Sequence, residues 1–140
     1  MKVPTVRCPY CRAKATLHPA NYVFGKDAKP GSLLYVCDRY PACDSYVGAH
    51  QKTKLPMGSL ADGDLRHKRI EAHKAFDWMW KSGLMTKSQA YKWMQAKLGI
   101  RSDYAHIAKF SYYMCDQLIA ACSQAKQNYR TVAQKEGMLT

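Results

Sequence analysis

The sequence predicts an α+β protein in which a small ribbon of short antiparallel strands is followed by three helices. Two observations lead to this fold class. Cysteines gather in two close pairs with strand-like segments between them, and from about residue 57 the apolar residues follow a helical period. We expect a ribbon over residues 1–56 and a helical region over residues 57–140, packed together as one composite unit.

The ribbon is predicted from four of the six cysteines. A "CPYC" motif begins at Cys8, and a second pair with five residues between its cysteines begins at Cys37. Two tight turns whose sulfurs converge supply the tetrahedral thiolate set that structural Zn²⁺ prefers. His18 and His50 are alternative ligands, but four thiolates already complete the shell. We therefore expect one structural zinc ion with these ligands: Cys8, Cys11, Cys37 and Cys43.

A redox motif or a disulfide would require sequence features that the rest of the chain does not have. A thioredoxin-like redox motif needs a βαβ context, and none surrounds Cys8. No apolar run approaches the ~18 residues that span a membrane, and the start lacks the apolar core of a signal peptide. We expect a cytoplasmic protein with no membrane partner, in which thiols stay reduced and a disulfide is disfavoured.

The ribbon strands are predicted from short apolar segments separated by turn residues. "ATLH" (15–18), "NYVF" (21–24) and "LLYV" (33–36) have strand composition. Pro19-Ala20 and "GKDAKPGS" break the chain between them. We expect Tyr35 to be buried, because so small a ribbon has little else with which to fill its core.

Three helices are predicted after the "HQKTKLPMGS" connector. The first runs from about Asp62 to Lys81 and ends before Gly83. The second begins with a capping box, Thr86 with Gln89, and ends at Gly99. After a turn in "YAHIAKF", the third is capped by Ser111 and reaches about Tyr129, and "RTVAQKEGMLT" is expected to fray.

Apolar positions in these helices indicate which faces are buried. In the first helix one arc of the helical wheel carries Leu65, Ala72, Phe76, Met79 and Trp80. Trp78 falls outside this arc and is expected to pack on the ribbon or to present an exposed aromatic ring. In the second helix the buried stripe is Ala90, Tyr91, Met94 and Leu98. Cys115 and Cys122 share one face of the third helix and are interpreted as core residues, about 10 Å apart and too far for a disulfide.

The charge balance favours a polyanionic partner. The chain has 22 Lys plus Arg against 10 Asp plus Glu, for a formal charge of +12. The excess is shared between residues 1–60 and residues 61–140, so it belongs to the folded surface and not to a tail. Nucleic acid is the chief candidate partner, and the alternative is that the charge only keeps the protein in solution.

Basic and aromatic residues interleave around the two cysteine pairs. Arginine and lysine follow phosphates, while aromatic rings stack on bases without much sequence choice, so single-stranded DNA or RNA is the predicted ligand. Arg66 and Arg69 in "RHKR" are expected to add at most a non-specific phosphate contact. The candidate contact residues are Arg7, Tyr10, Arg12, Lys14, Arg39, Tyr40, Tyr46, Lys52 and Lys54.

Patterns typical of enzymes are missing from the sequence. It has no Walker loop, no GxSxG and no HExxH, and Asp62 and Asp64 are explained by helix capping. A closed four-thiolate site leaves no coordination position for a substrate. We expect no catalytic residues and no small-molecule substrate. The competing function is a protein-interaction module of phage type that docks on a host or phage protein such as a polymerase or nuclease, with Trp78 or Trp93 as the candidate contact.

Two resemblances follow from these motifs. "CPYC" followed by "YVCDRYPACDSYV" resembles the zinc ribbons at the carboxyl end of type IA DNA topoisomerases, which implies single-stranded DNA binding. Such ribbons usually have glycine at the position of Arg12. The longer pattern, through "GSLADGDLR", "AYKWMQAKLGI" and "AHIAKF", resembles an uncharacterised family of zinc-finger-containing proteins of phages and bacteria. That second resemblance implies a metal site and no particular activity.

Overall fold

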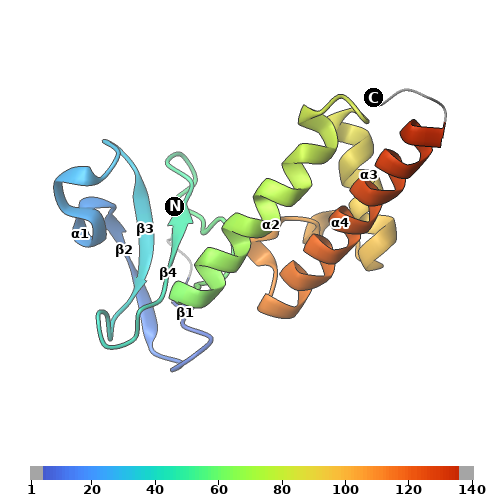
Figure 1. Ribbon diagram of the computed structural model, residues 1–140. Coiled ribbons are helices and arrows are strands. Elements are labelled where there is room, and N and C mark those ends of the chain that lie inside the picture. Colours follow the sequence, from blue (N-terminus) through green and yellow to red (C-terminus); the bar gives the residue numbers. More distant parts are fainter. Residues whose placement is uncertain (1–4, 136–140) are drawn as a thin grey trace. The chain divides into compact units, whose positions relative to one another are not determined.

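The chain folds into two compact units. The computed structural model describes residues 5–135, and its contacts separate Met1–Arg66, here the sheet unit, from His67–Thr140, here the helical unit (Figure 1). The mixed α and β composition is as predicted. Packing of the two units into one composite body stays a prediction. None of the helices in the described residues is both long and apolar enough to cross a membrane.

The sheet unit contains four antiparallel strands in the order β1-β2-β3-β4. Their bounds are Val6–Arg7, Lys14–Pro19, Leu33–Cys37 and Tyr46–Ala49. The outer edge of β4 is covered by the segment that follows it, because Met57 donates to the Gly48 carbonyl at 2.8 Å and Ala61 exchanges two backbone hydrogen bonds with Tyr46. The strands β2 and β3 match the prediction, whereas β1 and β4 were not predicted. β1 has only two residues, and β4 has a glycine, Gly48, which is rare in strands.

The two faces of the sheet bury different residues, because neighbouring side chains of a strand point to opposite sides. One face carries the larger core, with Cys8, Ala15, Tyr35, Cys37, Val47, Ala49 and Leu60. Tyr35 is buried as predicted, and its hydroxyl donates to the Lys54 carbonyl. The other face buries Leu34 and Val36 together with Ala20.

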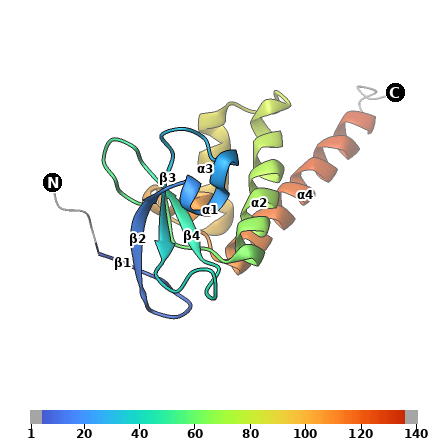
Figure 2. The same ribbon diagram turned by 90° about the vertical axis from the view of Figure 1, so that its left-hand side faces the viewer.

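The segment "NYVF" is a helix, and its prediction as a strand was wrong. It forms α1, Asn21–Phe24, which continues into a 3-10 turn at Gly25–Asp27. Both Val23 and Phe24 donate to the Ala20 carbonyl, which closes the first turn directly after β2. Figure 2 shows α1 beside the strands, where Ala20 and Val23 pack on Leu34 and Val36. A four-residue apolar run does not distinguish a strand from one helical turn by its periodicity.

Three longer helices follow: α2, Gly63–Lys81; α3, Lys87–Leu98; and α4, Tyr112–Lys135. Short 3-10 turns at Ser102–Tyr104 and Ile107–Lys109 replace the expected turn before α4. With α1, the described residues contain four α-helices, so the predicted number of three is corrected. The capping box of Thr86 and Gln89 is confirmed, as is Gly99 in the left-handed conformation that ends α3.

The last helix starts as predicted and extends further. The Ser111 hydroxyl accepts a hydrogen bond from the Met114 amide at 3.2 Å, which caps α4. The helix continues past Tyr129 to Lys135, so the first part of "RTVAQKEGMLT" is helical. Residues 136–140 of that segment lie outside the described residues.

The helical unit has its own apolar core. Most residues predicted as buried have almost no exposure: Ala72, Phe76, Met79, Ala90, Met94, Cys115 and Cys122, joined by Leu118. Trp80, Tyr91 and Leu98, also predicted as buried, are half-buried. The rings of Phe76 and Tyr91 meet edge to face at 5.0 Å and join α2 to α3. Trp78 packs on α4, with its ring 6.4 Å from that of Tyr129. This part of the chain therefore gains its stability from apolar burial.

Candidate metal centre and nucleic-acid interface

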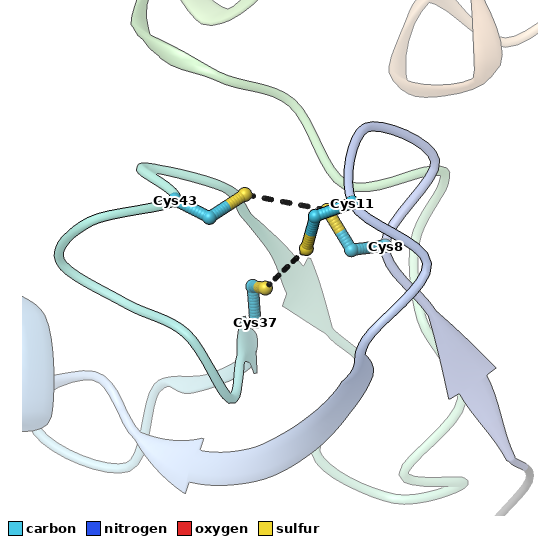
Figure 3. A group of neighbouring side chains, drawn as sticks. All are labelled: Cys8, Cys11, Cys37 and Cys43. Carbon is cyan, nitrogen blue, oxygen red and sulfur yellow. Dashed lines mark hydrogen bonds between the residues drawn. The ribbon is translucent and has the colours of Figure 1, made fainter.

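Four cysteines from two separate turns converge at one end of the sheet. Cys8 and Cys11 lie in the turn between β1 and β2, Cys37 ends β3, and Cys43 lies in the loop that leads to β4. Figure 3 shows their side chains pointing toward one another, and all four Sγ atoms lie within 4.8 Å of each other. The shortest separations are 3.6 Å between Cys8 and Cys43 and 3.4 Å between Cys11 and Cys37.

This donor set fits one structural zinc ion. A tetrahedron with Zn–S bonds of about 2.3 Å has sulfur–sulfur edges of about 3.8 Å, close to the separations in the cluster. All six cysteines are free thiols, and none is paired in a disulfide. Bound zinc would tie the two turns together and supply the positive charge that four adjacent thiolates need.

Backbone hydrogen bonds shape both turns so that the sulfurs converge. In the first turn Arg12 donates to the Cys8 carbonyl and Cys8 to the Ala13 carbonyl, each at 2.9 Å. Arg12 has φ 65°, so this arginine adopts the left-handed conformation for which glycine is better suited. In the second turn Cys43 donates to the Arg39 carbonyl at 3.0 Å. The Tyr40–Pro41 peptide bond is cis.

Cys8 and Cys37 differ in acidity because their surroundings differ. Burial alone would raise the pKa of Cys8, but hydrogen bonds from the backbone of Cys11 and Tyr10 and from neighbouring side chains lower it to about 7. For Cys37 burial dominates and raises the pKa to about 12. Cys8 therefore ionises more readily than Cys37, which needs a cation to become a thiolate.

One polar neighbour of the cluster was missed in the sequence. Ser45 is fully buried, and its hydroxyl lies 3.6 Å from the sulfur of Cys43. A hydroxyl in contact with a ligand sulfur orients that side chain and stabilises its charged form. In the sequence, the only indication of this role was that Ser45 lies two residues after Cys43.

The basic residues predicted as nucleic-acid contacts fall at the two ends of the sheet. Four of them are exposed near the cysteines: Arg7, Arg12, Lys14 and Arg39. Strand pairing places Arg7 beside Lys14, and a hydrogen bond from the Asp38 amide to the Lys14 carbonyl brings the loop that contains Arg39 to the same end. Lys52 and Lys54 are exposed beyond the opposite end, in the loop after β4.

Two further arginines have structural roles. The prediction of a phosphate contact is corrected for Arg69, which is buried, and stays a prediction for Arg66, whose side chain is 24% exposed. Arg69 is buried, and its Nε and Nη2 donate to the Phe110 carbonyl at 3.1 and 2.9 Å. Arg66 lies 3.9 Å above the ring of Tyr46 and forms an ion pair with Asp44 at 3.0 Å.

The three tyrosines selected from the sequence have unequal surroundings. Tyr10 is 46% exposed, and its hydroxyl accepts a hydrogen bond from the Asp62 amide at 3.2 Å. Tyr40 and Tyr46 are half-buried and meet edge to face at 6.4 Å. Both belong to a larger group that the sequence did not reveal. This group, here the aromatic cluster, consists of His18, Tyr22, Phe24, Tyr40 and Tyr46.

Comparison with known proteins agrees with the metal site. The model of a family described as a zinc-finger-containing domain matches residues 4–125, which is most of the chain. No curated protein and no solved structure matched the sequence. The match spans both units and includes all four clustered cysteines. This chain belongs to the family of proteins that contain this zinc-finger-containing domain.

Proposed function

We propose that this protein is a non-enzymatic nucleic-acid-binding protein that holds single-stranded DNA or RNA on a zinc-stabilised sheet. The observation that carries the proposal is the aromatic cluster on one face of that sheet, between two groups of exposed cations. Stacked bases and backbone phosphates are recognised by this combination of residue types without much sequence choice.

The aromatic cluster offers ring surface to a ligand. The rings of His18 and Tyr22 are stacked, with centroids 3.9 Å apart and an interplanar angle of 7°. Tyr22 then contacts Tyr40, which contacts Tyr46, and Phe24 meets Tyr46 edge to face at 5.7 Å. Tyr22 and Phe24 remain 52% and 44% exposed. A surface that displays two large rings, fixed by neighbouring rings, is suited to stacking on unpaired bases.

Charge surrounds this face at both ends. The cysteine end carries the exposed cations Arg7, Arg12, Lys14 and Arg39, and the opposite end carries Lys26, Lys29, Lys52 and Lys54. The five residues of β3 span about 14 Å between these ends at about 3.4 Å per residue. A single strand laid along the sheet would meet cations, then rings, then cations again.

The test is fluorescence anisotropy of the zinc-loaded protein with labelled single-stranded DNA, RNA and duplex DNA, from about 50 to about 300 mM salt. We expect tighter binding to single strands. If about five phosphates are neutralised, the log–log slope of affinity against salt should be about −3.5, because each contact to a single strand contributes about −0.7.

Two results would contradict the proposal. Equal affinity for duplex and single strands would remove the role of base stacking. An absence of binding at low salt would discard nucleic acid as the partner and would favour the protein-interaction function, whose binding should survive salt because it depends on an apolar contact.

A further inference from the structure

A groove opens at the end of the sheet opposite the cysteines, and the metal site does not use it. Its volume is about 880 Å³, within the range of about 300–1,000 Å³ typical of ligand sites. The walls come from α1, β3, β4 and the loop of residues 50–57. All of these belong to the sheet unit.

Apolar side chains form much of the wall and stay open to solvent. Phe24 is 44% exposed, Leu55 is 46% and Met57 is 45%, and all three line the groove. Gly48 contributes backbone only, and a Cβ there would lie 3.2 Å from the Met57 sulfur. Three large apolar side chains gathered in a concave, exposed site indicate a surface that takes a ligand.

The polar groups of the groove favour a negatively charged ligand that also carries hydrogen-bond donors and acceptors. Lys29 and Lys52 line it and are exposed, and none of its described lining residues is acidic. The Gln51 amide nitrogen donates to the Gly31 carbonyl at 2.7 Å, which fixes the amide and leaves its oxygen as an acceptor. The Thr53 oxygen accepts from the Leu55 amide at 3.3 Å, which leaves the hydroxyl proton as a donor.

The groove is continuous with the aromatic cluster. Phe24 belongs to both, since it lines the groove and its ring touches that of Tyr46. A strand that stacks on the cluster and continues toward this end of the sheet would bring its next nucleotide to the groove. Continuity with the cluster and the cationic rim therefore favour a nucleotide as the occupant.

We infer that the groove takes one unstacked nucleotide of a bound single strand. The base lies against Phe24, Leu55 and Met57, its polar edge meets Gln51 and Thr53, and its phosphate pairs with Lys29 and Lys52. This inference rests on the proposed function and adds to it one position along the strand that is bound differently from the others.

The experiment combines an abasic scan with groove variants of the full-length, zinc-loaded protein. A labelled single strand of about six nucleotides is prepared with one abasic position at a time, and binding is measured by anisotropy. Leu55→Asp removes an apolar wall and adds a negative charge at an exposed site, so folding should be unaffected. Lys52→Ala is matched by Lys26→Ala, an exposed lysine at the same end of the sheet that does not line this groove.

The expected result is that several abasic positions weaken wild-type binding about tenfold, and that in Leu55→Asp one of them no longer does so, while positions stacked on the aromatic cluster keep their effect. Lys52→Ala should weaken binding more than Lys26→Ala, although both remove one charge. An abasic profile that is the same in Leu55→Asp and in the wild type, together with equal effects of the two lysine variants, would overturn the inference and leave the proposed function intact. A wild-type protein that binds no single strand would overturn both.

Discussion

The two units of this protein use cysteine in opposite ways. In the sheet unit four thiols face one another in two turns, and their separations fit a metal ion. In the helical unit Cys115 and Cys122 lie singly among apolar side chains of α4, and burial raises the pKa of Cys122 to about 12. The comparison shows that the spacing and the neighbours of a cysteine decide its role. The four clustered cysteines need a bound cation to stabilise the sheet unit, whereas Cys115 and Cys122 stabilise the helical unit by packing.

The stability of the two units should therefore respond differently to chelation, and this is the largest effect expected. Removal of zinc should unfold the sheet unit, because apparent binding energies of about 10–16 kcal/mol in small zinc modules are also folding energies. The helical unit should remain folded on its own apolar core. Two-dimensional NMR before and after chelation would follow both units, and unchanged amide signals from β3 would contradict the account.

A matched pair of cysteine substitutions sharpens the same comparison. Cys37→Ser should abolish stoichiometric zinc binding and melt the sheet unit. Cys122→Ser should keep one zinc per chain and destabilise the helical unit by about 1–3 kcal/mol, because it buries a hydroxyl among apolar groups. Native mass spectrometry and thermal melting measure the two effects. Zinc loss from both variants, or from neither, would contradict the claim that Cys37 is a metal ligand and Cys122 a packing residue.

A buried arginine offers a test within the helical unit alone. Arg69→Ala removes two hydrogen bonds to the Phe110 carbonyl. We expect a loss of about 1–3 kcal/mol in unfolding free energy, since a buried carbonyl loses its partner. Lys74→Ala, at an exposed position of the same helix, should change stability little. Denaturant unfolding measures the unfolding free energy of both variants. Equal values for the two would show that Arg69 has no structural role.

The smallest expected effect concerns the turn at the first cysteine pair. Arg12→Gly should stabilise the zinc-loaded sheet unit by about 0.5–1 kcal/mol, because glycine adopts a positive φ without steric cost. The same change should weaken single-strand binding about twofold to fivefold by removing a cation. Lys14→Ala should weaken binding similarly without the gain in stability. A lower melting temperature for Arg12→Gly would contradict this interpretation of the turn.

The metal cluster and the long helices could be predicted because their signals are local. Cysteine spacing defines each turn, and the capping box at Thr86 and the glycine at position 99 mark the ends of α3. The aromatic cluster could not be predicted in full. His18, Tyr22 and Phe24 meet Tyr40 and Tyr46 only because α1 folds back on the sheet, and that contact depends on tertiary packing.

Arg69 is a different case, since a local signal was present in the sequence. It lies four residues after Leu65 and three before Ala72, so it shares the buried arc of α2 with them. The basic run "RHKR" suggested a phosphate contact, but the helical period places Arg69 on the buried arc. A charged residue on an apolar arc indicates a buried hydrogen-bond partner, here the Phe110 carbonyl.

The most direct test of the central claim compares two aromatic variants in one binding assay. Tyr22→Ala removes an exposed ring from the aromatic cluster, and Tyr113→Ala removes a ring of 68% exposure from the helical unit. Anisotropy with a labelled single strand should show about a tenfold loss for Tyr22→Ala, as expected for one stacked base, and no change for Tyr113→Ala. Equal affinities of both variants and the wild type would contradict the claim that this sheet binds nucleic acid through its aromatic cluster.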